Sequence, residues 1–317
     1  MSGLVDGAVG GVTAPARPVD LSVRLGDLLL ANPVMPASGC FGPELAELVP
    51  VHRLGAVVTK TVFAQARSGN RAHRLGESAH GMLNSVGIPS RGAREFARSG
   101  LPAYQRLGVP VVVSIGGLSE HEYLHVAEEL AGTEVAALEV NVSCPNLERG
   151  GATLSADVGA VRRVVAGVVA RTEVPVLVKL SPDLASIDSA ARAAEDAGAA
   201  AITVCNSFPS LAVDPGTRRA TLGNGTGGLS GPAIKPLALR LVWQAAQAVT
   251  IPVVGCGGIG TARDVAEFLV AGASAVQIGT ATFARPFVMT EIVRELPALA
   301  AELGVTRLTD LVGTLSF

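Results

Sequence analysis

Eight short apolar runs recur along the chain, and each of them ends in small or polar residues. They lie at 33–39, 56–62, 110–117, 137–145, 175–182, 201–207, 252–259 and 275–281. The runs are continuous in Val, Ile and Leu and do not alternate with polar residues, which is typical of strands buried on both faces. This pattern limits the fold more than any other feature, because such strands belong to parallel sheets with helices on both sides.

The segments between several of these runs have the spacing of helices. Clear examples lie at 119–131, 157–171, 186–197, 232–249 and 261–271. Asp157 and Thr261 stand where N-cap residues belong, and the sequence AGA follows two of the segments, where glycine is expected to end a helix. Eight buried strands that alternate with helices predict a (β/α)8 TIM barrel. A doubly wound open sheet is the alternative, which eight regular units favour less.

The segment 21–30, LSVRLGDLLL, precedes the first strand and has the pattern of a hairpin with its turn at Gly26-Asp27. We expect it to close the bottom of the barrel. Residues 1–20 lack the basic region and compact apolar stretch of a signal peptide, and are expected to form a flexible tail. Because no linker or change in composition divides the remainder, residues 21–317 are expected to form one domain.

Composition excludes several classes of function. The net charge of −2 and the 3% content of aromatic residues give no reason to expect nucleic acid or an anionic membrane as a partner. The four cysteines have neither the spacing of a metal site nor that of a disulfide framework, so no metal is expected and a reducing, cytosolic compartment is. No apolar run reaches the length of about 18 residues that a membrane span needs.

The active site of such a barrel lies at the carboxyl ends of its strands. Polar residues and glycines gather at these positions. They are Ser38, Lys60, Thr61, Ser114, Asn141, Cys144, Lys179, Asn206, Ser207, Gly257, Gly258, Gly279 and Thr280. Since Asn and Lys are costly in a strand core unless they are paired, their clustering at one end predicts a site there.

Glycine-rich loops follow the last two runs, as GCGGIG at 255–260 and QIGTA at 277–281. This is the usual phosphate-binding position of the barrel, although tight turns alone would also need glycine. Lys60 and Lys179 interrupt otherwise apolar runs. Each could simply extend to the rim, but a lysine there also suits an electron-rich ring or a carboxylate, as in a flavin site.

Cys144 follows the fourth run in the segment NVSCPN. A buried structural cysteine is one interpretation. A general base is the other, because the residue stands in a polar exit from a strand, although a free thiol has a pKa of about 8.5.

Two long connections complete the candidate site, because long loops in a compact domain are usually functional. One spans 81–89 and offers Asn84 and the backbone N–H groups of Ser85, Val86, Gly87 and Ile88, which would suit a carboxylate or an imide. The other spans 224–236 and could cover the site as a mobile segment.

Six segments together resemble the dihydroorotate dehydrogenase family. In chain order they are PASGCFG, VTKT, GMLNSVGIP, NVSCPN, VKLSP and GTGGLSGPAIKP. The resemblance runs from about residue 20 to the C-terminus. It implies an FMN enzyme of pyrimidine biosynthesis that oxidises dihydroorotate to orotate. In that reaction a base, here Cys144, takes a proton from C5 of the substrate while hydride leaves C6.

The resemblance also implies two sets of binding residues. FMN would contact Ser38, Lys60, Thr61, Ser114, Asn141, Lys179, Cys205, Gly231, Gly257, Gly258, Gly279 and Thr280. The substrate would contact Lys60, Asn84, Ser85, Val86, Gly87, Ile88, Asn141, Asn206 and Ser207.

Within the family, cysteine as the base resembles the type 1 enzymes, and PASGCFG and GGLSGPAIKP resemble type 1B. Type 1B implies a homodimeric core in a heterotetramer with a subunit that carries FAD and a [2Fe-2S] cluster and reduces NAD+. Ser114 and Ser207 depart from that pattern and are similar to the fumarate-linked type 1A homodimers. The alternatives are therefore type 1A, a flavin reductase acting on another pyrimidine, a flavin-binding electron-transfer subunit without turnover, and a phosphate-binding barrel without flavin.

Overall fold

The computed structural model describes residues 19–143, 157–183 and 186–317. Within these ranges eight parallel strands form one sheet in the order β3-β18-β17-β12-β11-β10-β9-β4. Their bounds are β3 (Val34–Pro36), β4 (Val57–Val58), β9 (Val111–Ile115), β10 (Ala137–Asn141), β11 (Val176–Leu180), β12 (Ala201–Val204), β17 (Val253–Cys256) and β18 (Ala273–Ile278). The N–H of Gly55 donates to the carbonyl of Val34 at 3.0 Å, which brings the two outer strands together. The sheet is thus nearly closed, and the predicted (β/α)8 barrel is confirmed.

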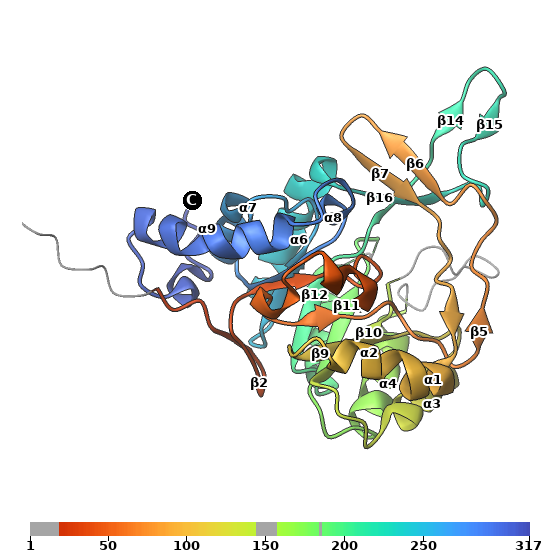
Figure 1. The fold of residues 1–317 in the computed structure, drawn as a ribbon, viewed down its shortest axis with the longest axis horizontal. Helices are drawn as coiled ribbons and strands as arrows, with labels where there is room; N and C mark the ends of the chain where they lie inside the picture. Colours follow the sequence, from red (N-terminus) through yellow and green to blue (C-terminus); the bar gives the residue numbers. More distant parts are fainter. Residues whose placement is uncertain (1–18, 144–156, 184–185) are drawn as a thin grey trace, which may run out of the picture.

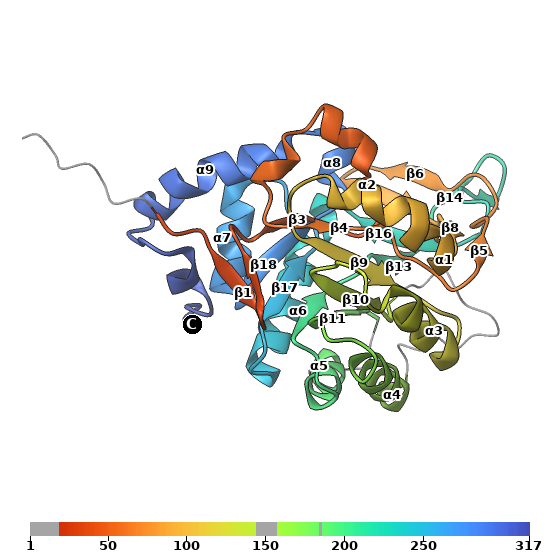
Figure 2. The ribbon, with the colours of Figure 1, turned by 60° about the horizontal axis from the view of Figure 1, so that its bottom comes forward.

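Helices surround the strands (Figure 1, Figure 2). The longer ones are α3 (Glu120–Leu130), α4 (Val158–Val169), α5 (Ile187–Asp196), α6 (Lys235–Ala248), α7 (Ala262–Val270) and α9 (Val288–Glu302). Shorter ones are η1 (Pro43–Glu47), η2 (Val51–Arg53), α1 (Ala93–Glu95), η3 (Phe96–Gly100), α2 (Leu101–Gln105), η6 (Pro232–Ile234), α8 (Ala281–Ala284) and η7 (Leu308–Leu311). Both predicted N-caps are present, since Asp157 accepts from the Gly159 N–H and Thr261 forms a capping box with Asp264.

The bottom of the barrel is filled by an apolar layer. Each strand contributes one inward-facing residue to it, and these are Met35, Val58, Val112, Ala137, Leu177, Ala201, Val254 and Ala275. The antiparallel hairpin of β1 (Val23–Leu25) and β2 (Leu28–Leu30) packs Val23, Leu25, Leu28 and Leu30 against this layer. The hairpin expected at the barrel bottom is therefore confirmed, with its turn at Gly26-Asp27.

Two residues further along the strands, the barrel interior becomes polar. Side chains alternate along a strand, so these residues point inward like those of the layer below. The buried residues at this level are Ser114, Glu139, Lys179, Thr203, Cys256 and Gln277. We call them the polar layer. It lies directly below the carboxyl ends of the strands, where the sequence predicts the site.

A second, antiparallel sheet lies beyond those strand ends (Figure 1). Its order is β13-β16-β7-β6, from β6 (Leu75–Ser78), β7 (Gly81–Asn84), β13 (Phe208–Ser210) and β16 (Gly227–Ser230). The two long connections read as loops in the sequence thus pair with each other, through β7 and β16. The pairs β5 (Ala66–Arg67) with β8 (Ser90–Arg91) and β14 (Val213–Asp214) with β15 (Arg219–Ala220) extend from it.

The described chain begins beside its own C-terminal region. The Asp20 N–H donates to the Thr306 carbonyl at 2.9 Å, and the Leu308 N–H donates back to the Asp20 carbonyl at 3.0 Å. Most of the expected flexible tail, residues 1–18, lies outside the described residues. No helix in the described ranges is both long and apolar enough to cross a membrane.

The hairpin offers a matched test of the apolar layer. Leu30 is 0% exposed and its neighbour Leu29 is 53% exposed. We expect Leu30→Ala to lower the free energy of unfolding by about 2–5 kcal/mol, because it leaves a cavity under the barrel. Leu29→Ala should change it by no more than about 0.5 kcal/mol. Denaturant unfolding would measure both, and equal effects would contradict the packing described.

Candidate active site

A cavity of about 620 Å³ lies between the carboxyl ends of the barrel strands and the β13-β16-β7-β6 sheet. This volume is within the range of small-molecule and cofactor sites. Most of the residues predicted from the sequence line it. They are Ser38, Lys60, Thr61, Asn84, Val86, Gly87, Ile88, Asn141, Lys179, Cys205, Asn206, Ser207, Gly231, Gly257, Gly258, Gly279 and Thr280. Cys144 lies outside the described residues.

Two of the expected binding residues, Ser114 and Ser85, are fully buried and do not line the cavity. Ser114 lies below it, and its Oγ is 2.9 Å from Oγ1 of Thr61. The N–H of Ser85 donates to the Arg74 carbonyl at 2.8 Å, so it is not one of the free N–H groups expected from the sequence. Both residues hold neighbours in place, a role that their positions in the sequence do not reveal.

An amide network fixes the chain just before Cys144. Nδ2 of Asn141 donates to Oγ1 of Thr61 at 3.1 Å, and its Oδ1 accepts from Oγ of Ser143 at 2.7 Å. Nδ2 of Asn206 donates to Oγ of Ser143 at 2.9 Å. Ser143 is therefore held from β10 and from the end of β12. Because both Asn side chains also line the cavity, the network places amides around the point where Cys144 follows.

Lys179 supplies positive charge at the floor of the cavity. Its side chain is 3% exposed, and its Nζ donates to Oε1 of Gln277 at 2.9 Å. Burial lowers the pKa of Lys179, but the negative charges of Cys256, Glu139, Cys40 and Cys205 would raise it, and the net pKa lies above its usual value. An ammonium has three donors, so Lys179 keeps N–H groups for a ligand above it.

The thiols near Lys179 are poor bases. Burial raises the pKa of the Cys40 thiol to about 12, and it also raises the pKa of Cys205 and of Cys256. All three thiols are therefore protonated at neutral pH, and a thiolate is the form that reacts. Among the described cysteines, none is suited to remove a proton.

Lys60 has the opposite environment to Lys179. Its pKa is lowered by burial and by the positive charge of Arg74. It stands at the rim of the cavity beyond β4. The two lysines therefore differ in their readiness to lose a proton, and a negatively charged ligand would offset the repulsion between Lys60 and Arg74.

Glycines at the other end of the cavity leave room for an anion. A Cβ on Gly258, whose φ is +76°, would lie 2.9 Å from the backbone nitrogen of Lys235, and a Cβ on Gly257 would lie 2.7 Å from Cβ of Ala238. Larger residues would therefore fill this cradle. Exposed backbone N–H groups in such a turn suit phosphate, so the cradle fits the phosphate end of FMN.

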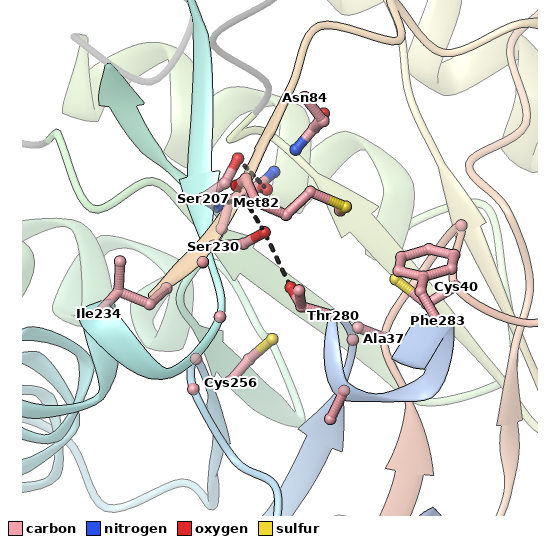
Figure 3. Close-up of a pocket in the computed structure, with 18 of the residues that line it drawn as sticks. Ala37, Cys40, Met82, Asn84, Ser207, Ser230, Ile234, Cys256, Thr280 and Phe283 are labelled. Carbon is pink, nitrogen blue, oxygen red and sulfur yellow. Dashed lines mark hydrogen bonds between the residues drawn. The ribbon is translucent and has the colours of Figure 1, made fainter. Parts of the chain in front are cut away.

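Hydrogen bonds hold the second sheet against the barrel at this end. Oγ1 of Thr280 donates to Oγ of Ser230 at 2.8 Å, and Ser230 donates to the Met82 carbonyl at 3.3 Å (Figure 3). Ser230 and Met82 also line the cavity, and so do Cys40 and Phe283. The sequence analysis did not single out these four residues, although Cys40, Met82 and Ser230 stand within its motifs.

No cluster of three or more His, Cys, Asp or Glu suitable for a metal occurs in the described ranges. The cavity instead combines an ammonium at its floor, amides at two strand ends and a glycine cradle. This arrangement suits an aromatic cofactor with a phosphate group, together with a small polar substrate.

Comparisons with known proteins agree with this geometry. The family model for dihydroorotate dehydrogenase matches residues 20–300. Relatives named dihydroorotate dehydrogenase B (NAD(+)), catalytic subunit, include one from Trichlorobacter lovleyi, which is 44% identical over 93% of this chain and 98% of its own. Others are from Geobacillus kaustophilus (44% identical; 92% and 95% covered) and Listeria welshimeri (40% identical; 92% and 97% covered). The chain therefore belongs to the dihydroorotate dehydrogenase family.

Proposed function

We propose that this chain oxidises dihydroorotate to orotate with bound FMN, in pyrimidine biosynthesis, as the catalytic subunit of an NAD+-linked enzyme. The observation that carries the proposal is the single cavity that joins Lys179, the amides of Asn141 and Asn206, and the glycine cradle. Family membership gives this cavity its reaction, because relatives of similar length carry that name.

The residues fit FMN at both of its ends. The cradle of Gly257 and Gly258, with Gly279 and Thr280, would hold the phosphate through backbone N–H groups. Lys179 and Asn141 would contact the ring end. When bound, FMN supplies the acceptor for the hydride that leaves C6 of dihydroorotate. The ammonium of Lys179 stabilises the negative charge that arrives with it, because that charge develops in a site shielded from water.

The substrate would lie between the barrel and the second sheet. Asn84 from β7, Asn206 and Ser207 line this part of the cavity and offer amide and hydroxyl groups. Such groups can bind the carboxylate and the ring amides of dihydroorotate, and Lys60 adds a positive charge. Cys144 takes the proton from C5, and Ser143, held by both asparagines, sets the direction in which the chain enters it.

The electron acceptor is the finer part of the proposal. The relatives' names favour NAD+ and a partner subunit, which would carry FAD and a [2Fe-2S] cluster. A homodimeric core in a cytosolic heterotetramer is the assembly we expect, and the free thiols of Cys40, Cys205 and Cys256 suit a reducing compartment. Ser207, which lines the cavity, favours the second candidate, a fumarate-linked homodimer.

Replacing Cys144 tests the base. We expect Cys144→Ala to reduce turnover of dihydroorotate by roughly 10²–10⁴-fold at neutral pH, the usual contribution of a general base. Cys144→Ser should regain activity as the pH rises, because a hydroxyl loses its proton less readily than a thiol. Turnover and the visible absorption of bound FMN would be measured together. Unchanged turnover in Cys144→Ala, with FMN retained, would remove Cys144 from the mechanism.

Reoxidation of the reduced protein tests the acceptor. After dihydroorotate has bleached the flavin without oxygen, NAD+ should restore its colour only when an iron–sulfur and FAD subunit is added. Fumarate alone should have no effect, because no group for NAD+ or fumarate chemistry beyond the one cavity is proposed here. Rapid recovery with fumarate alone would favour the type 1A alternative.

A further inference from the structure

Glu139 is a buried carboxylate that the proposed reaction does not use. It lies on β10 in the polar layer and is 0% exposed. Its Oε2 accepts a hydrogen bond from Oγ1 of Thr203 at 3.0 Å and another from Nε2 of Gln277. Its Oε1 has no hydrogen-bond partner among the described residues. A charge in such a position is costly unless another charge compensates for it, so Glu139 needs an explanation.

Gln277 connects Glu139 to Lys179. Its Oε1 accepts from Nζ of Lys179 at 2.9 Å, which directs its Nε2 to Glu139. The amide is therefore oriented by a donor on one side and an acceptor on the other. This orientation suits an ammonium at Lys179 and a carboxylate at Glu139, because each end of the amide dipole then faces the opposite charge.

The other groups that face Lys179 cannot supply the compensating charge. They are the thiols of Cys40, Cys205 and Cys256, which come from the loop after β3, the end of β12 and β17. Burial raises the pKa of all three, so they are neutral at neutral pH. Glu139 is therefore the anion that balances the buried ammonium while the cavity holds no anionic ligand.

We propose that Glu139, acting through Gln277, keeps Lys179 protonated and aimed at the cavity, and thereby sets the reduction potential of the flavin. Glu139 is a positioning residue in this account, since it lies below the cavity and does not line it. The inference rests on the proposed function only in requiring FMN in the cavity. It does not depend on the substrate.

The proposal makes a statement about protons. With Glu139 in place, Lys179 carries its proton before and after the flavin is reduced. With the carboxylate removed, burial would lower the pKa of Lys179, and its Nζ would lose the proton as the pH rises through that lowered value. Each two-electron reduction by an added dye would then bring one extra proton from solvent onto Nζ, because the charge that arrives on the flavin favours the ammonium.

Glu139→Gln tests this consequence, with FMN potential measured against pH by dye-coupled reduction. We expect the potential of the variant to fall more steeply with pH than that of the wild type, by the equivalent of one additional proton per two electrons. Thr203→Val is the matched control. It removes the other hydrogen bond to Glu139 but no charge, so it should keep the wild-type slope. A wild-type slope in Glu139→Gln would overturn the proposal.

A cofactor-free measurement tests the pair independently. In apoprotein, Lys179→Met should lower the unfolding midpoint strongly, because it leaves Glu139 buried and uncompensated. Adding Glu139→Gln to that variant should restore much of the loss, which is the non-additivity expected of interacting residues. Strictly additive losses would overturn the proposal. If instead the wild type binds FMN but does not oxidise dihydroorotate, the proposed function fails while both of these tests keep their meaning.

Discussion

The rest of the site depends on one buried contact, the hydrogen bond from Nζ of Lys179 to Oε1 of Gln277 inside the barrel. A barrel of this kind is normally filled with apolar side chains, and here the lower layer is. The polar layer above it replaces packing with a chain of hydrogen bonds from Lys179 to Glu139. A buried polar network of this kind stabilises a fold only when its members are paired, so it restricts which residues can stand at each strand end.

The cavity exists because two different parts of the fold meet above that layer. The barrel provides the ammonium, the amides and the glycine cradle, and the second sheet provides Asn84, Met82 and Ser230. The hydrogen bond between Thr280 and Ser230 joins the two parts at the cradle. A cofactor and a substrate can then lie in one shielded space, where charge interactions are stronger than in water.

The barrel could be predicted from the sequence because strands buried on both faces leave continuous apolar runs, and because caps such as Thr261 mark the helices between them. The strand ends likewise gave most residues of the cavity. The antiparallel sheet was missed, since β7 and β16 are far apart in the chain and rich in glycine, and neither has an alternating pattern.

The sequence also could not separate cavity residues from those one layer below. Ser114 stands at a strand end like Thr61, but the inward face of β9 places it beneath Thr61. Glu139 has the reverse history: it looks like an isolated charge in an apolar run, and only the register of β10 with its neighbours shows that it faces Gln277 and Thr203.

The central claim is that this barrel binds FMN and uses it to oxidise dihydroorotate. The most direct measurement is an anaerobic titration of the purified protein with dihydroorotate, followed by visible absorption and by orotate formed. The account predicts about one FMN per chain, bleached with the release of an equal amount of orotate. A protein that stays colourless after incubation with FMN, or whose flavin dihydroorotate does not bleach, would contradict it.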